Sequence, residues 1–163
     1  MSLNVHFAQP QVVALAESSV FNRSISAKHL YQRACYRGWL GQVWAALTGR
    51  SRTLLNLTAI TTTSTVYNRR YAGTQAVRIR EIRGSEGRCH DFDAAFYPLQ
   101  PHTEHRWLSI ATAWQAGVSL PPIDLIRVGG IFFVRDGHHR ISVARAMGQP
   151  DIDAVVTVWE AAK

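Results

Sequence analysis

The sequence predicts an α+β fold, with helices packed on a small mixed sheet and a mainly helical region before it. Apolar residues recur at three- and four-residue steps in the first third of the chain, which is typical of an amphipathic helix. From Ala76 onward, short β-branched runs alternate with helical patterns and with Gly or Pro breaks. A length of 163 residues and a hydrophobic content of 47% suffice for the core of one ordinary domain.

Residues 1–73 form the predicted N-terminal region, which is basic, mainly helical and closed by a linker. The start of this region is weakly patterned, and from Ser26 an amphipathic helix runs to Gly49. Gly38 and Gly41 each weaken this helix by roughly 1 kcal/mol relative to alanine unless they allow close packing, so a break there stays open. The apolar positions of the helix are Leu30, Ala34, Trp39, Leu40, Val43, Trp44 and Leu47.

Residues 74–163 form the predicted sheet domain. The expected order is a strand at 77–82, a polar loop at 84–93, a helix from Thr103 to Gly117, strands at 123–128 and 131–134 joined by Gly129-Gly130, a helix ending at Met147, and a strand at 154–159. The five tryptophans are expected to fill cores or to join the two halves, because each buries a large area: Trp39, Trp44, Trp107, Trp114 and Trp159.

Charge divides the chain into two unlike halves. Up to Gln75 the sequence has eight basic residues and the single acid Glu17, whereas the remainder has ten basic and ten acidic residues. Such an excess is typical of an arm that meets nucleic acid, a membrane surface or an acidic partner, and equally of a solubilising face. The candidate contacts to DNA or to an acidic protein are Arg33, Arg37, Arg69 and Arg70, the last two lying between Tyr67 and Tyr71 in the linker.

Several other classes of protein are not expected. No stretch approaches the ~18 apolar residues of a membrane span, so we expect no membrane partner and a cytoplasmic location. Cys35 and Cys89 lie far apart without a Cys-x-x-Cys pair, which favours free thiols in a reducing compartment. Cys89, His90 and Asp91 are adjacent in sequence and have no fourth ligand at a suitable spacing, so no metal site is predicted.

The densest chemistry lies in the turn from Asp136 to Arg140, where an apolar strand pattern meets a short helical one. Gly137 can adopt a positive φ, His138 and His139 can donate or accept hydrogen bonds, and Arg140 offers a charged planar fork. A strand-to-helix junction also presents free backbone N–H groups and the positive end of the helix dipole. Together these features predict an anion site, with phosphate as the expected guest.

The segment from Gly137 to Gly148 resembles the Gly-x-x-Arg-x-x-x-Ala box of the ParB/sulfiredoxin-like domains. It matches that box at Gly137, Arg140, Ala144, Arg145 and Gly148. The order of elements from Val77 to Trp159 is also similar to that fold, so the resemblance covers just over half of the chain. It implies a prokaryotic protein that binds a nucleotide, either ATP, ADP or CTP, with Mg²⁺ as a further candidate.

Two details of the box indicate which members of this family the chain resembles most. His138 stands where sulfiredoxins carry their redox cysteine, which argues against reduction of a sulfinic acid. The Asp-Gly-His-His-Arg form is closer to the free-serine-kinase relatives than to the ParB proteins of chromosome partitioning, whose box carries a glutamate and an extra arginine.

The resemblance further implies that the polar loop faces the box. Its catalytic candidates are Glu86, Asp91, Asp93 and His138, where carboxylates would carry Mg²⁺ through a nucleotide or accept a proton. Its nucleotide-binding candidates are Asp136, Gly137, His138, His139, Arg140 and Arg88. From the residues alone, Asp91-Phe92-Asp93 is equally a capping or turn motif, with Phe92 and Phe96 in the core.

Two functions therefore stand side by side. The first is a nucleotide-dependent enzyme, a small-molecule phosphotransferase or a nucleotide hydrolase. The second is a non-enzymatic, nucleotide-gated DNA-binding or regulatory adaptor protein that uses the basic N-terminal half.

Overall fold

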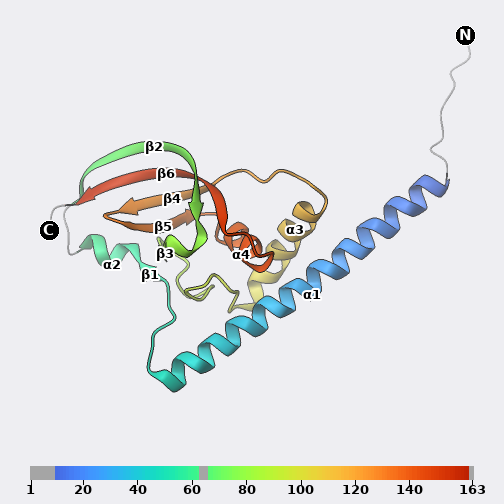
Figure 1. The fold of residues 1–163 in the computed structure, drawn as a ribbon, viewed down its shortest axis with the longest axis horizontal. Helices are drawn as coiled ribbons and strands as arrows, with labels where there is room; N and C mark the ends of the chain where they lie inside the picture. Colours follow the sequence, from blue (N-terminus) through green and yellow to red (C-terminus); the bar gives the residue numbers. More distant parts are fainter. Residues whose placement is uncertain (1–9, 63–65, 162–163) are drawn as a thin grey trace, which may run out of the picture.

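The computed structural model describes residues 10–62 and 66–161, which form one mixed sheet with helices on both of its faces (Figure 1). The strands are β1 (Leu55–Asn56), β2 (Val66–Arg78), β3 (Ile82–Ser85), β4 (Ile123–Val128), β5 (Ile131–Asp136) and β6 (Asp151–Ala161). Their order across the sheet is β1-β3-β5-β4-β6-β2. Parallel and antiparallel neighbours both occur, so the predicted α+β class with a mixed sheet is confirmed.

The helices cover the two faces unequally. On one face, α4 (His138–Ala146) contributes Ile141 and Ala144 to the main core, and α3 (Glu104–Gln115) packs beyond it. The indole N–H of Trp107 in α3 donates to the Ser142 hydroxyl of α4 at 2.9 Å. On the other face, α2 (Leu57–Thr62) buries Leu57 against side chains of β4, β5 and β6.

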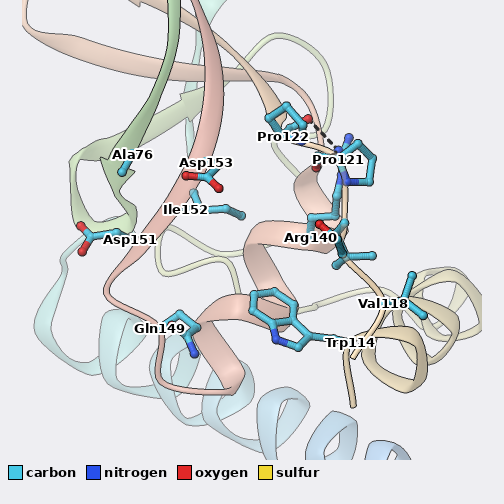
Figure 2. Close-up of a pocket in the computed structure, with 12 residues that line it drawn as sticks. Ala76, Trp114, Val118, Pro121, Pro122, Arg140, Gln149, Asp151, Ile152 and Asp153 are labelled. Carbon is cyan, nitrogen blue, oxygen red and sulfur yellow. Dashed lines mark hydrogen bonds between the residues drawn. The ribbon is translucent and has the colours of Figure 1, made fainter. Parts of the chain in front are cut away.

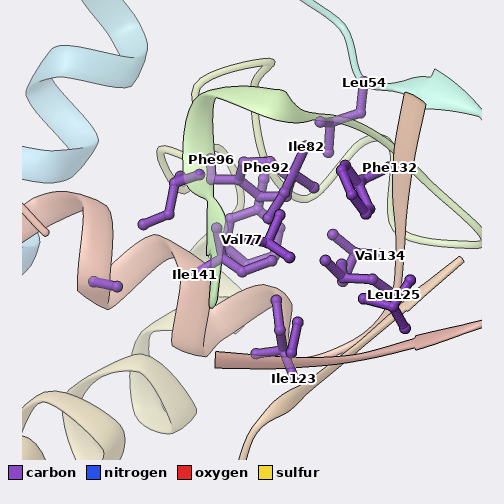
Figure 3. Packing of buried hydrophobic residues seen from close by; sticks show 14 of the residues in the cluster. Leu54, Val77, Ile82, Phe92, Phe96, Ile123, Leu125, Phe132, Val134 and Ile141 are labelled. Atoms are coloured by element: carbon purple, nitrogen blue, oxygen red, sulfur yellow. The ribbon is translucent and has the colours of Figure 1, made fainter. Parts of the chain in front are cut away.

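The polar loop after β3 contributes to the main core. Phe92 and Phe96 are almost fully buried, and Figure 3 shows them in the cluster that Ile82, Val134 and Ile141 also join. Their place in the core is therefore confirmed.

The first helix, α1 (Pro10–Thr48), is longer than predicted and unbroken at its two glycines. Gly38 lies so close to the loop after β3 that an added Cβ would meet the Pro98 carbonyl oxygen at 3.2 Å. A Cβ on Gly41 would lie 2.6 Å from the Arg52 guanidinium carbon. Both glycines therefore permit close approach on the inner face, which was the condition under which the helix could continue.

The prediction that Trp39 and Trp44 fill a core was wrong. Their exposed fractions are 58% and 64%, because small residues occupy the inner face of α1 in their place. Trp107 and Trp159 are buried as predicted, and Trp114 is partly buried and packs against the core.

The segment predicted as a linker is an edge strand. β2 pairs antiparallel with β6 from Val66 opposite Ala161 to Arg78 opposite Asp151, and the strand continues through residues 72–74, where the register shifts between Tyr71 and Thr74. The side chains at 68–71 are exposed, so this edge strand lacks the apolar alternation by which half-buried strands are recognised.

Other boundaries moved less. A 3-10 turn, η1 (Ile79–Glu81), divides the strand predicted at 77–82, and another, η2 (Pro101–Thr103), precedes α3. The predicted helix from Thr103 and the strand at 123–128 are confirmed, and β5 continues two residues further than predicted. Within the described residues, no helix has the length and apolarity needed to cross a bilayer.

Candidate anion-binding site

The site is organised by the turn between β5 and α4. Gly137 has a φ of +101°, and an added Cβ would lie 2.4 Å from Cγ2 of Ile123. Both the backbone conformation and the close approach therefore require glycine at this position. The turn directs His138 and His139 into the first turn of α4, under the loop that follows β3.

A pocket of about 300 Å³ opens at this turn. Its ionisable lining residues are four arginines, two carboxylates and two histidines: Arg88, Arg106, Arg135, Arg140, Glu86, Asp136, His138 and His139. Positive charge therefore exceeds negative charge around the pocket, although the domain as a whole is neutral.

Arg140 is held firmly by its surroundings. Its Nη1 donates to the carbonyl oxygens of Pro121 and Pro122 at 2.6 and 2.8 Å, and its Nη2 lies 2.5 Å from Oδ2 of Asp136. Only 13% of its side chain is exposed. Figure 2 shows Arg140 at one side of a second cavity, of about 340 Å³, which Trp114 also lines. Arg140 therefore lines both cavities, and its guanidinium group donates three hydrogen bonds to other residues of the chain.

The other arginines differ in how strongly they are paired. Nε of Arg135 lies 3.1 Å from Oε2 of Glu86, which neutralises that part of the rim. Nη1 of Arg88 is 3.7 Å from the Asp91 carboxylate, at the long end of an ion pair. Arg106 forms no ion pair with any residue that the structure describes. Arg88 and Arg106 are therefore the cations most available to an anion in the pocket.

A hydrogen bond from β3 fixes the His138 ring. Its Nε2 lies 2.7 Å from Oγ of Ser85, and this Oγ also accepts the backbone N–H groups of Gly87 and Arg88 at 3.2 and 3.0 Å. Because those two donors occupy the lone pairs of the oxygen, the serine O–H must donate to Nε2. Neutral His138 therefore carries its proton on Nδ1.

The environment keeps both histidines uncharged. Burial, followed by the positive charge of Arg88 and the neighbouring ring of His139, lowers the pKa of His138 to about 4. Burial and the charges of Arg88 and Arg106 likewise lower the pKa of His139 to about 4. At neutral pH the pocket therefore offers two neutral imidazoles beside permanent cations.

The three predicted catalytic carboxylates lie at different positions in the structure. Glu86 lines the pocket, whereas Asp91 lies to one side, with its Oδ1 3.2 Å from Nε2 of His102. Asp93 is fully buried away from the pocket, 2.7 Å from Nη2 of Arg52.

Asp93 has the role of a turn residue. Its Oδ1 accepts the backbone N–H groups of Ala95 and Tyr97 at 2.9 and 2.8 Å. These bonds belong to the turn that leads into Phe96, a residue with a φ of +60°. The carboxylate therefore stabilises the loop, in agreement with the turn motif that the sequence also allowed.

Sequence reasoning missed Ser85 and Arg106. Ser85 ends a short strand and has no exposed surface, so its hydroxyl positions His138 and is not reached from the pocket. Its only local signal was its place within the polar loop predicted at 84–93. Arg106 reaches the pocket because α3 packs on α4, and nothing in its local sequence indicates that contact.

No group of three or more His, Cys, Asp or Glu side chains suited to a metal ion occurs within residues 10–62 and 66–161. No protein-family model matches the chain, and no curated protein matches it. Among solved structures, sulfiredoxin from Arabidopsis thaliana is similar to it, with a TM-score of 0.36 and 20% identity over 51% of this chain and 82% of that chain. What the pocket can bind follows from its own side chains.

Proposed function

We propose that the pocket binds a nucleotide through its phosphate groups. The observation that carries this proposal is the position of Arg88 and Arg106 beside the first turn of α4, since among the described residues Arg88 is weakly paired and Arg106 has no ion pair. Guanidinium groups bind phosphate oxygens through two parallel N–H donors, and a partly enclosed pocket strengthens such bonds.

The backbone supports the same ligand. The N–H groups of His138, His139 and Arg140 precede the first bond of α4, which runs from Ile141 N to the Gly137 carbonyl at 3.0 Å. Such N–H groups at a helix start, together with the helix dipole, attract an anion. The Nδ1–H of His138 adds a neutral donor that does not depend on pH near 7.

Arg140 has a different role from the one its motif suggests. Because its bonds to Pro121, Pro122 and Asp136 use three N–H groups, two remain for a ligand. We assign to Arg140 the positioning of the Gly137 turn, and to Arg88 and Arg106 the main charged contacts with phosphate.

The enzymatic version of this function depends on Glu86. It is the one of the three predicted carboxylates that lines the pocket, and Arg135 holds it in place. A phosphotransferase or nucleotide hydrolase would use Glu86 to carry Mg²⁺ through the nucleotide or to accept a proton. Glu86→Gln should then abolish turnover while nucleotide binding persists.

A thermal-shift screen with ATP, ADP, CTP and GTP, with and without Mg²⁺, tests the binding proposal. A ligand present at ~100 times its dissociation constant adds about 2.7 kcal/mol to the stability of the folded state. Arg106→Ala should lose most of this gain, because it removes a charged contact without breaking an ion pair. Arg83→Ala, at an exposed position of β3 outside the pocket, is the matched control. An equal response of the Arg106 variant and the wild type would refute the site.

The DNA-binding alternative is favoured by one observation, that Arg33, Arg37 and Arg70 are exposed without an ion pair among the described residues. Arg69 differs, because its guanidinium lies over the Trp159 ring at 4.2 Å. The Tyr67 side chain, expected to stack between bases, lies outside the described part of the chain. If this function holds, affinity for duplex DNA falls steeply with salt, and an Arg33→Gln/Arg37→Gln/Arg70→Gln variant loses it.

A further inference from the structure

We propose that two copies of this chain pair through the outer face of α1, with the two helices antiparallel. The proposal concerns six large side chains on that face, which we term the outer stripe: Tyr36, Trp39, Leu40, Val43, Trp44 and Leu47. It is independent of the nucleotide pocket, because α1 contributes no residue to the lining of that pocket.

On α1, small residues face the protein and large residues face outward, which is the reverse of the usual arrangement. The residues that face α3, α4 and the loop after β3 are mostly small and buried: Ala27, Ala34, Gly38, Gly41 and Ala45. The outer stripe has the large side chains, with exposed fractions between 38% for Val43 and 77% for Leu47. Figure 1 shows α1 along one side of the molecule, with α3 and α4 on its inner flank. A helix built only to pack on this domain would bury its tryptophans inward.

The stripe is large enough for a stable dimer. A standard interface takes about 800 Å² from each partner. Single aromatic side chains bury roughly 150–250 Å², and the stripe holds Tyr36, Trp39 and Trp44, each more than half exposed. With its three aliphatic members, the stripe supplies an area of that order. Tyrosine and tryptophan are also the residues that dominate protein interfaces energetically.

The spacing of the stripe is self-complementary. In an antiparallel pair centred between Gly41 and Gln42, Tyr36 meets Leu47 of the second copy and Leu40 meets Val43, whereas Trp39 and Trp44 cover the two flanks of the seam. The four central members of the stripe therefore meet one another across the two-fold axis, and the same tryptophan from each copy lies on each flank, as a two-fold symmetric interface requires. The three- and four-residue steps keep all six on one side of the helix, in the manner of antiparallel helix pairs.

The response to salt distinguishes a second copy of this chain from other partners of the outer stripe. The sequence has no Asp or Glu from Ser18 to Arg80, so the charged residues that α1 itself places beside the stripe are basic, although Glu104 of α3 lines a pocket with Trp39. In the pairing above, Arg33 of one copy faces Arg50 of the other at both ends. Exposed like charges of this kind cost little compared with burying tryptophan, and salt screens them. Salt should therefore tighten the dimer, whereas it would weaken binding to an anionic lipid surface or an acidic protein.

Sedimentation velocity on the full chain over a dilution series tests the proposal. We expect a monomer–dimer equilibrium that shifts toward the dimer as salt is raised. Leu40→Glu should weaken it by at least about a hundredfold, because two charges would be buried at the symmetry axis. Ser24→Glu, at an exposed position of α1 outside the stripe, adds the same charge and should leave the equilibrium unchanged. Unfolding curves of both variants should match the wild type.

A charge substitution tests the register. Thr48 is exposed and would lie on the same flank of the seam as Arg37 of the second copy, so Thr48→Glu should tighten the dimer roughly threefold and Thr48→Arg should weaken it. A wild type that stays monomeric at every concentration, or a dimer that Leu40→Glu does not affect, would overturn the proposal. A monomer that binds phosphatidylcholine vesicles only when they contain phosphatidylglycerol would overturn it in favour of a lipid surface.

Discussion

Replacing Ser85 by alanine removes the hydroxyl that links β3, the loop after it and the first histidine of α4. The Oγ atom accepts the N–H groups of Gly87 and Arg88 and donates to Nε2 of His138, and Ser85 has no exposed surface. The smaller methyl group leaves these three partners without their bond.

The loss of stability depends on whether each of these three groups can form a new hydrogen bond. A buried polar group left unpaired costs about 1–3 kcal/mol. Gly87 and Arg88 are exposed residues at the pocket, so their N–H groups can bond to water, whereas His138 is 5% exposed. The unpaired Nε2 of His138, together with the weaker hydrogen bonds of the Gly87 and Arg88 N–H groups, should destabilise the folded state by about 3 kcal/mol. The proton of His138 is then no longer fixed on Nδ1.

Urea unfolding of Ser85→Ala measures the free energy, and nitrogen chemical shifts of the His138 ring report the tautomer. Ser109→Ala, at an exposed position of α3, is the control and should change stability by less than about 0.5 kcal/mol. A loss below about 1 kcal/mol with an unchanged tautomer would refute the conclusion that Ser85 orders the site.

Three further perturbations have defined outcomes. The folded-state pKa of His138 and of His139 is about 4, below the ordinary 6.5, so the unfolded chain binds more protons between these values. Stability is therefore complete above pH ~6.5 and falls toward pH ~4, by up to about 2.7 kcal/mol per pH unit, and a urea midpoint that stays flat between pH ~6.5 and ~5 would contradict this. Gly137→Ala places a Cβ 2.4 Å from a neighbouring side chain at a positive φ and should cost about 3 kcal/mol in the same assay, with nucleotide binding lost; a stable variant that still binds would show that the turn tolerates a side chain. Asp93→Ala leaves Arg52 unpaired and should cost about 3 kcal/mol without changing nucleotide affinity, whereas a selective loss of affinity would return Asp93 to the site.

Prediction from sequence succeeded where the signal is local. The helix at 104–115 and the strands at 123–128 and 131–136 have periodic apolar positions and Gly or Pro at their ends. Gly137 was located in the same way, because a glycine between a strand pattern and a helical pattern indicates a special backbone conformation, here a φ of +101°. These features depend on neighbours within a few residues of each other.

Prediction failed where distant segments decide the outcome. β2 is a strand because β6 supplies its hydrogen bonds, and its exposed side chains carry no alternation. Periodicity showed that α1 has an apolar face but not which face would be buried. Gly38 and Gly41 turned the opposite side inward, which leaves Trp39 and Trp44 exposed.

The sequence by itself determined the α+β class, the basic N-terminal half and the position of the turn from Asp136 to Arg140. Only the tertiary structure decided which charges meet at that turn. It brought Arg106 to the pocket from α3, tied Arg140 to two proline carbonyls, and moved Asp93 into a buried turn. The reason is physical: backbone conformation follows largely from local sterics and hydrogen bonding, whereas the charge and protonation of a pocket depend on side chains that only packing brings together.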